Sequence, residues 1–191
     1  NYLGVANGDP FEFVSGSNWT SNSGYWLFYY CSNGATCPVR GITYPNALAL
    51  ERVSGTTTYN LEDTMAAKYL QKSDGVNFNT QGYNISSANW IRIYSGAFNA
   101  SNSTINVGVN VELLNTNAYI LGGNSNWYVG GHWTSQSTSP SWNPGTSKII
   151  FNGSTQQNLS TMGTITPFYD VELRNSGTKL YLKNDTQMRS I

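Results

Sequence analysis

The stretch that decides the fold runs from Trp133 to Leu182 and reads WTSQSTSPSWNPGTSKIIFNGSTQQNLSTMGTITPFYDVELRNSGTKLYL. Short strand-like runs alternate in it with clusters of Asn, Gly, Ser and Pro. These residues form tight turns, because Gly and Asn tolerate left-handed backbone conformations and Pro fixes its own φ. The stretch therefore predicts stacked β-structure, with strands at Lys148–Phe151, Gln156–Leu159, Phe168–Leu173 and Leu180–Leu182.

The same pattern extends over the rest of the chain. Turn clusters recur at intervals of roughly ten residues, which is typical of an all-β sandwich, barrel or solenoid. The segment Leu61–Lys72 is a helix candidate because of its Ala and charged residues, but we expect strand or irregular structure there. The further predicted strands are Phe11–Val14, Tyr25–Tyr30, Ala47–Val53, Trp90–Tyr94, Thr104–Leu114, Tyr119–Leu121 and Trp127–Val129.

Turn phrases recur with variation between Val76 and Gly130, and the pair Asn-Trp at positions 18, 89 and 126 opens a strand-like run each time. Approximate repetition of short strands with Asn-rich turns is what a parallel β-helix needs, because each coil lies over the preceding one. We therefore predict an all-β chain that forms a parallel β-helix, a solenoid-like stack. An antiparallel β-sandwich is the alternative, since both folds need inward-facing alternation.

Composition restricts the partners. The formal net charge is zero, only 10% of the residues are charged, and the basic residues are scattered singly. Nucleic acid and anionic membrane surfaces require a basic patch, so we expect neither as a partner. No apolar run approaches the roughly eighteen residues that a membrane span needs, and we expect no membrane insertion.

The two cysteines indicate the compartment. Cys31 and Cys37 enclose the turn-forming pentapeptide Ser-Asn-Gly-Ala-Thr, which suits a local disulfide between neighbouring strands. Two reduced buried thiols are the alternative. The disulfide would stabilise the fold by about 2 kcal/mol and would place the protein outside the cytoplasm.

Residues for catalysis or metal binding are scarce. His132 is the single histidine and lies in a Gly-rich turn, where a hydrogen-bonded or solvated role is expected. The acidic pairs Asp9 with Glu12, Glu62 with Asp63 and Asp170 with Glu172 show no sign of convergence, and Asp170 and Glu172 are predicted to form the solvent side of their strand. We expect no catalytic, cofactor or metal site, and hence no enzyme.

Aromatic side chains are the remaining candidates for recognition. Trp and Tyr rings can stack on sugar rings, since a flat apolar face with a polar edge matches a pyranose. Trp127, Tyr128 and Trp133 cluster in the sequence near His132 and are candidate glycan-stacking residues. Burial in the core of the chain is the favoured alternative for such aromatic clusters.

Two stretches of the sequence resemble the repeats of a known group of proteins. The phrases WNPGT, IIFNG and FYDVELRNSGTKLYL of the tail and FNTQGYNIS after Val76 are similar to the degenerate repeats of very large secreted cell-surface proteins of the Bacteroidota. The resemblance implies a right-handed parallel β-helix, export by the type 9 secretion apparatus and a role in cell adhesion. It covers residues 76–191, which it implies are β-solenoid repeats that continue beyond the fragment. Residues 1–75 depart from it and are expected to be an all-β N-terminal cap or insertion with the disulfide loop.

One short motif fits the same source. Asp63-Thr64-Met65 resembles the acceptor that Bacteroidota use for O-glycosylation of exported proteins, which makes Thr64 a candidate modification site. An ordinary turn is the alternative interpretation.

Two functions are consistent with the sequence. The first is a structural or adhesive segment of an extracellular cell-surface protein, a spacer that presents a binding surface. Its partners would be other segments of the same large protein, neighbouring surface-protein chains, or extracellular glycans. The second is a carbohydrate-binding or carbohydrate-active β module. A cleft with an arginine and paired carboxylates would favour the second function, whereas a smooth column of stacked coils would favour the first.

Overall fold

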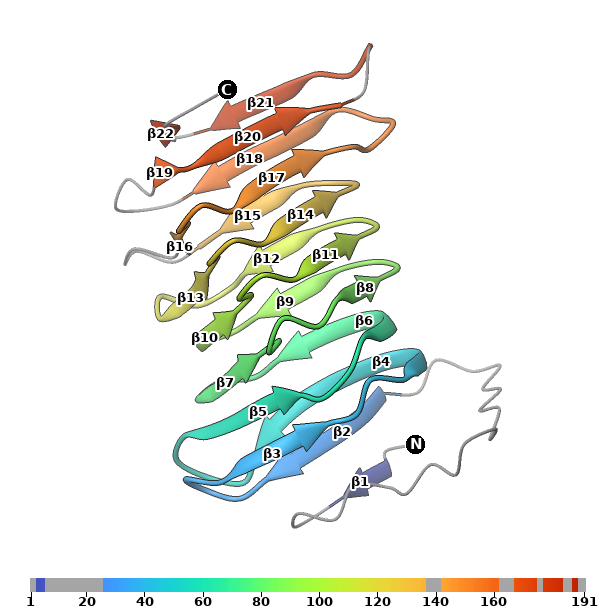
Figure 1. Ribbon diagram of the computed structural model, residues 1–191, viewed down its shortest axis with the longest axis vertical. Helices are drawn as coiled ribbons and strands as arrows, with labels where there is room; N and C mark the ends of the chain where they lie inside the picture. The colour runs from blue at the N-terminus through green and yellow to red at the C-terminus, as the bar shows by residue number, and fades with distance from the viewer. Residues whose placement is uncertain are drawn as a thin grey trace.

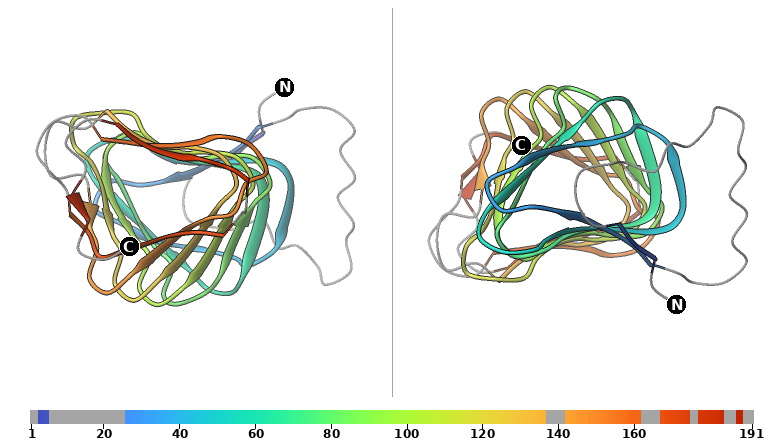
Figure 2. Two further views of the ribbon diagram at one scale, coloured as in Figure 1. Left: turned by 90° about the horizontal axis from the view of Figure 1, so that it is seen from above. Right: turned by 90° about the horizontal axis from the view of Figure 1, so that it is seen from below.

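The computed structural model describes residues 3–5, 26–136, 142–161, 167–174, 177–183 and 187–188. In this part of the chain all regular elements are β-strands, and all strand pairs are parallel. The strands stack one above the next along the molecule (Figure 1). Seen along the stack, successive coils lie over one another around a common interior (Figure 2). The chain is a parallel β-helix, as predicted, and the antiparallel sandwich is excluded.

Most coils contribute three strands, which stack into three faces. The first face consists of β8 (Ile85–Ser87), β11 (Thr104–Val107), β14 (Asn126–Val129), β17 (Lys148–Phe151) and β20 (Asp170–Leu173). The second face consists of β9 (Ile91–Ile93), β12 (Val111–Leu113), β15 (Trp133–Ser135), β18 (Gln157–Thr161) and β21 (Leu180–Lys183). The third face consists of β3 (Thr36–Val39), β5 (Thr57–Leu61), β7 (Val76–Asn79), β10 (Gly96–Asn99), β13 (Ala118–Leu121) and β16 (Trp142–Asn143).

The N-terminal coils contain longer strands: β2 (Trp26–Cys31), β4 (Thr43–Arg52) and β6 (Met65–Lys72). The first half of β6 pairs with β8 and its second half pairs with β9, so β6 joins the first and second faces. The two faces therefore belong to one 14-stranded sheet. Two short pairs complete the fold, β1 (Leu3–Val5) with β2 and β19 (Pro167–Phe168) with β22 (Gln187–Met188).

Residues one coil apart stand in register and form columns. On the first face, Ile85 pairs with Ile105, Ile105 with Trp127, Trp127 with Ile149, and Ile149 with Val171. These five side chains point inward and are buried. Burial of such columns stabilises the stack, at about 25 cal/mol for each Å² of apolar surface removed from water.

Aromatic rings fill the wider part of the interior. The Trp127 ring lies 5.5 Å from that of Phe98, 5.3 Å from that of Trp133 and 6.2 Å from that of Trp142, measured between centroids. Edge-to-face and tilted arrangements of this kind are the ones that aromatic quadrupoles favour. The strands of all three faces are thereby packed against one shared core.

One corner of the coil, between the third and first faces, repeats a left-handed backbone position in four successive coils. The residues are Gln81 (φ 56°), Ser101 (φ 50°), Gly123 (φ 59°) and Gly145 (φ 58°). Each of these residues bends the chain in the same place, so the corner stays aligned along the stack. The Asn, Gly and Pro clusters in the sequence correspond to such corners.

The described coils before residue 75 pair directly with the coils after it. β5 pairs with β7 and β6 pairs with β8 and β9 across residue 75, so the coils before it continue the same stack. Residues 26–75 therefore stack in the same way as the later coils. Their turns differ in sequence from those of the later repeats. The division into a cap or insertion and a repeat region stays a prediction.

Most predicted strands are confirmed, including strand in place of helix at Leu61–Lys72, where β6 forms. Two predicted strands are each divided. Thr104–Leu114 contains β11 and β12, because the main chain turns a corner at Gly108, and Phe168–Leu173 contains the end of β19 and then β20, with a bend at Tyr169. Phe11–Val14 lies outside the described residues.

Candidate functional site

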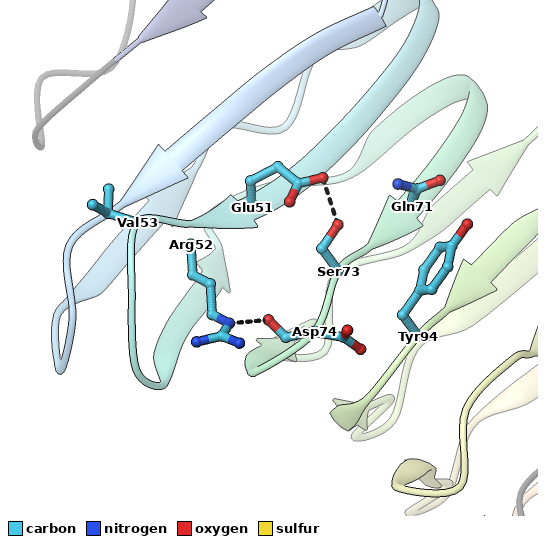
Figure 3. A pocket seen from close by; sticks show the side chains of 7 residues that line it. All are labelled: Glu51, Arg52, Val53, Gln71, Ser73, Asp74 and Tyr94. Atoms are coloured by element: carbon cyan, nitrogen blue, oxygen red, sulfur yellow. Dashed lines mark hydrogen bonds between the residues drawn. The ribbon is translucent and has the colours of Figure 1, made fainter.

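A hollow of about 430 Å³ lies at the corner where the second face turns into the third. Its lining residues come from the ends of β4, β6 and β9 and from the turns that follow these strands (Figure 3). We call this surface the corner hollow, and it is formed by Glu51, Arg52, Val53, Gln71, Ser73, Asp74 and Tyr94.

Glu51, Ser73 and Tyr94 occupy equivalent positions in three successive coils. The residues before them pair in register and are buried, namely Leu50, Lys72 and Ile93. Because side chains alternate between the two sides of a strand, the residues that follow point outward. Parallel stacking thereby places a carboxyl group, a hydroxyl group and an aromatic ring along one line, at strand spacings of about 4.8 Å.

The Glu51 carboxyl group is held by the next coil. Ser73 Oγ donates a hydrogen bond to Glu51 Oε1 at 2.5 Å. Burial raises the pKa of Glu51 and the charge of Asp74 raises it further, while the hydrogen bond from Ser73 lowers it. Glu51 therefore keeps its proton to a higher pH than an exposed glutamate does.

The charged groups beside Glu51 are also fixed across coils. Arg52 Nε donates to the main-chain carbonyl of Asp74, and Arg52 Nη1 donates to the carbonyl of Gly55 at 2.5 Å. The Asp74 carboxylate accepts a hydrogen bond from Asn115 Nδ2 at 2.9 Å. The guanidinium and the carboxylate are therefore positioned by bonds of their own and do not depend on a ligand for their orientation.

Lys72 lies in β6 between two lining residues but points inward. Its side chain is 1% exposed, and its Nζ donates to the main-chain carbonyls of Val76, at 2.6 Å, and of Ser95. Burial lowers the pKa of Lys72 to about 7, against a smaller raising effect of Asp74. Lys72 thus ties the corner together from inside, and its amine is not part of the exposed lining.

A second hollow of about 800 Å³ adjoins the corner hollow. The two share Arg52 and Asp74, and the second continues over the turn at Leu114–Asn117 to Gln136. The combined surface therefore extends across the coils that contain β4, β6, β9, β12 and β15.

The lining offers a definite set of interactions. Glu51 and Asp74 supply acceptor oxygens, the guanidinium of Arg52 and the amide of Gln71 supply donors, and Tyr94 supplies an aromatic ring. With both carboxyl groups ionised, negative charge exceeds positive charge by one in the corner hollow. Such a surface suits a hydroxyl-rich ligand without negative charge.

The prediction that Trp127 and Trp133 stack on glycans is wrong for this structure. Their side chains are 0% and 1% exposed, and they pack against each other in the core. Both occupy inward positions of their strands. They are core residues, which was the alternative interpretation of this aromatic cluster. Tyr128, between Trp127 and Val129, points outward and is half-buried.

Tyr128 lines a separate hollow of about 500 Å³ over the corner between the first and second faces. Main-chain atoms of Gly108 and Gly130 form part of this hollow, and no acidic residue lines it. The guanidinium of Arg174 lies 5.5 Å from the centre of the Tyr128 ring. Tyr128 is thus the one predicted stacking residue whose side chain reaches the surface.

The predicted disulfide is confirmed. Cys31 at the end of β2 is bonded to Cys37 in β3, with 6.2 Å between the Cα atoms, and both residues are buried. A disulfide of this kind indicates an oxidising environment. It closes the turn between the second and third faces in the coil that contains β2 and β3.

Thr64 is exposed in the turn just before β6. Its main-chain amide donates to Asp63 Oδ1 at 2.6 Å, so the two residues form a local turn. The hydroxyl group is accessible from solvent, and O-glycosylation at Thr64 stays a prediction.

His132 forms contacts between coils. Its main-chain amide donates to Asn110 Oδ1 at 2.8 Å, and its Nδ1 accepts a hydrogen bond from the main-chain amide of Asn158 at 3.0 Å. His132 thus contacts the coil before it through its main-chain amide and the coil after it through its imidazole.

The two acidic pairs from the sequence that the structure describes, Glu62 with Asp63 and Asp170 with Glu172, do not line the corner hollow. Glu62 and Asp63 are exposed, and Asp9 and Glu12 lie outside the described residues. Asp170 and Glu172 form the solvent side of β20 as predicted, and both pair with Lys148, at 3.2 and 2.7 Å. Hydrogen bonds from Arg174 and then from Lys148 lower the pKa of Glu172 to about 2.

Sequence reasoning did not find the corner hollow. A signal was present, because Glu51 and Tyr94 lie near the ends of the predicted strands Ala47–Val53 and Trp90–Tyr94, and Ser73 directly follows Leu61–Lys72, about one coil from each. The coil length varies along this chain, because the register partners Ile85 and Ile105 are 20 residues apart, whereas Ile105 and Trp127 are 22 residues apart. Without a constant period, the sequence does not show which surface residues become neighbours.

Among the described residues, no group of three or more His, Cys, Asp or Glu side chains is arranged to hold a metal ion. The same residues include no helix that is long and apolar enough to cross a membrane. Comparison with protein-family models, with curated proteins and with solved structures finds no match to the chain. The chain is therefore classified by its architecture alone, as a parallel β-helix with one disulfide bond.

Proposed function

We propose that the chain is a structural and adhesive segment of an extracellular cell-surface protein, which spans distance and presents a binding surface. The observation that carries the proposal is the unbroken stack. Six strands of the third face follow one another in register, and inward side chains from all three faces form one buried core. A stack of this kind is a stiff element whose length is set by the number of its coils.

The outer surface suits a spacer in water. Few charges are available, and polar side chains bond from coil to coil instead, as where Asn79 Nδ2 donates to Asn60 Oδ1 at 2.9 Å. Across the second face, Arg92 forms an ion pair with Glu112 at 2.5 Å. These bonds run along the stack and add to the main-chain bonds between coils.

The location and partners in the proposal rest on the disulfide and on the sequence resemblance. An oxidising compartment fits an extracellular position at the cell surface. Export by the type 9 apparatus, glycosylation at Thr64 and contacts with other segments of the same protein or with neighbouring surface chains belong to this proposal.

A carbohydrate-binding or carbohydrate-active module is the second candidate. One observation favours it, namely that Arg52 and the carboxyl groups of Glu51 and Asp74 lie together in the corner hollow. Carbohydrate binding at this site is compatible with the adhesive function. Cleavage of a polysaccharide there would instead make the chain an enzyme.

Surface display tests the proposed function. The chain is anchored on a bacterial cell that does not adhere by itself, and retention of the cells under flow is measured on surfaces coated with polysaccharides. We expect retention above that of cells that display the anchor alone, with no release of soluble sugar from the coating. Absence of retention on all coatings, or release of sugar fragments, would contradict the proposal.

A further inference from the structure

The corner hollow has the composition of a ligand site, and we propose that it binds a neutral glycan. Tyr94 lies against one sugar ring, and Glu51 and Gln71 form hydrogen bonds with its hydroxyl groups. The inference rests on the proposed function, because it names the ligand and the site of the adhesive surface.

The types of side chain that line the corner hollow support a saccharide as its ligand. Sugar hydroxyl groups donate and accept, so they need acceptors such as the Glu51 carboxyl group and donors such as the Gln71 amide in one place. The Tyr94 side chain stands beside Gln71 at the rim of the hollow (Figure 3). An aromatic ring next to a few polar groups is the usual composition of a site that orients a ligand of mixed polarity.

The shape of the two adjoining hollows supports an oligosaccharide rather than a monosaccharide as the ligand. The corner hollow and the adjoining hollow share Arg52 and Asp74 and together extend from the end of β4 to the turn after β12. A ligand along this surface would meet equivalent corners of successive coils. A linear oligosaccharide fits an elongated site of this kind better than a compact ligand.

The charges favour a neutral glycan over an acidic one. Two carboxyl groups and one guanidinium line the corner hollow, and the guanidinium is bound to main-chain carbonyls. A uronic acid would bring a third carboxylate close to Glu51 and Asp74. Repulsion between like charges at short range opposes that approach.

The site is also rigid before a ligand arrives. Ser73 holds Glu51, and Asn115 holds Asp74, through hydrogen bonds between coils. Side chains that are already oriented lose little conformational entropy on binding, which improves affinity. By comparison, no acidic residue lines the hollow at Tyr128, and a guanidinium lies near the Tyr128 ring.

The test uses the whole chain and a panel of linear hexasaccharides. Neutral glucose, mannose, xylose and galactose oligomers are compared with an oligogalacturonate by isothermal titration calorimetry. We expect one or more neutral oligomers to bind and the acidic oligomer to bind at least roughly 10-fold more weakly. In Tyr94→Ala and in Glu51→Gln, affinity for the bound neutral oligomer should fall by roughly 10-fold or more.

Matched variants control for effects on the fold. Tyr119→Ala removes a tyrosine that is 38% exposed on the third face, and Glu62→Gln removes an exposed carboxylate outside the hollow. Both should bind as the original chain does. Hydrogen exchange of the unsubstituted chain, with protection expected around residues 71–74 and 92–96, gives a readout that needs no variant.

The outcomes separate the two proposals. Loss of binding in Tyr128→Ala but not in Tyr94→Ala, or exchange protection far from the corner hollow, would overturn the glycan site while cell retention still supports the adhesive function. No binding of any neutral oligomer would overturn it as well. Glycan binding at the corner hollow without retention of displaying cells would support the site and contradict the adhesive function.

Discussion

Gly123 lies one coil after Ser101 at the corner between the third and first faces, so close that a Cβ on Gly123 would be 2.2 Å from the Ser101 carbonyl oxygen. The same carbonyl accepts a hydrogen bond from the amide of Asn124 at 2.7 Å. Both Gly123 and Ser101 have a left-handed backbone. The left-handed φ angle at position 123 therefore favours glycine, and the lack of space for a Cβ requires it.

Substitution of Gly123 by alanine should separate these two requirements. Gly34 also has a positive φ, but nothing lies within 4 Å of its added Cβ. Gly34→Ala should lower the free energy of unfolding by about 1 kcal/mol, the cost of the left-handed conformation alone. Gly123→Ala should lower it by clearly more, because main-chain atoms of two coils must move apart. Urea denaturation of both variants checks this, and equal losses would contradict the close approach.

The inward position of Trp127 can be tested against the outward position of its neighbour. Trp127→Ala should reduce the free energy of unfolding by about 3–5 kcal/mol, since it leaves a large cavity among aromatic rings. Tyr128→Ala should reduce it by less than about 1 kcal/mol. Chemical denaturation measures both values. A small effect of Trp127→Ala would mean that its ring is not part of the core.

Lys72 should make the stability depend on pH. Its pKa in the folded state is lowered to about 7 from a usual value of 10.5. Between these two values the unfolded chain binds a proton that the folded chain does not bind, so the free energy of unfolding rises with pH. Below about pH 7 both states are protonated at Lys72 and its contribution stays constant.

The measurement is urea denaturation from about pH 7 to about pH 10 for the original chain and for Lys72→Met. Methionine does not titrate, so the difference between the two free energies of unfolding isolates the effect of Lys72. We expect this difference to shift in favour of the original chain as pH rises, by a few kcal/mol at most. A difference that does not change with pH would show that the Lys72 amine is not desolvated.

The coil is expected to be a removable unit. Gly96 pairs with Ala118, so deletion of residues 96–117 joins Ser95 to a residue in the equivalent position. The shortened chain should fold and be shorter along the stack by about 4.8 Å, the spacing of neighbouring strands. Deletion of residues 104–114 removes β11 and β12 without the third-face strand and should prevent folding. Circular dichroism and small-angle scattering of both deletions report the outcome, and a folded second deletion would contradict the three-strand coil.

Much of the architecture was predictable because it depends on local properties. Short alternating runs such as Trp127–Val129 form strands, and Gly and Asn clusters form corners, whichever coils they join. The spacing of Cys31 and Cys37 around a turn predicted their disulfide. Where prediction failed, as at Thr104–Leu114, an apolar run continued through the corner at Gly108. An added Cβ at Gly108 would lie 2.1 Å from the Ala88 carbonyl oxygen, a close approach that only the stacked coils reveal.

The site was not predictable in the same way. Glu51, Asp74 and Tyr94 are separated in sequence by about a coil or more, and they become neighbours only because their strands stack in one register. A shift of a single residue in that register would exchange the inward and outward side chains of a strand. Trp127 and Tyr128 illustrate this, since neighbouring aromatics of similar size have opposite environments.

By itself the sequence determined that this chain is all β, that its strands stack as coils with polar turns, and that two cysteines close one turn. These properties follow from turn chemistry and side-chain alternation over a few residues. The tertiary structure decided which aromatics fill the core, that residues 26–75 belong to the same stack, and which carboxyl groups line the corner hollow together with Arg52. The reason is that coils of unequal length are aligned by packing and hydrogen bonding between coils, and neither interaction is visible within one strand.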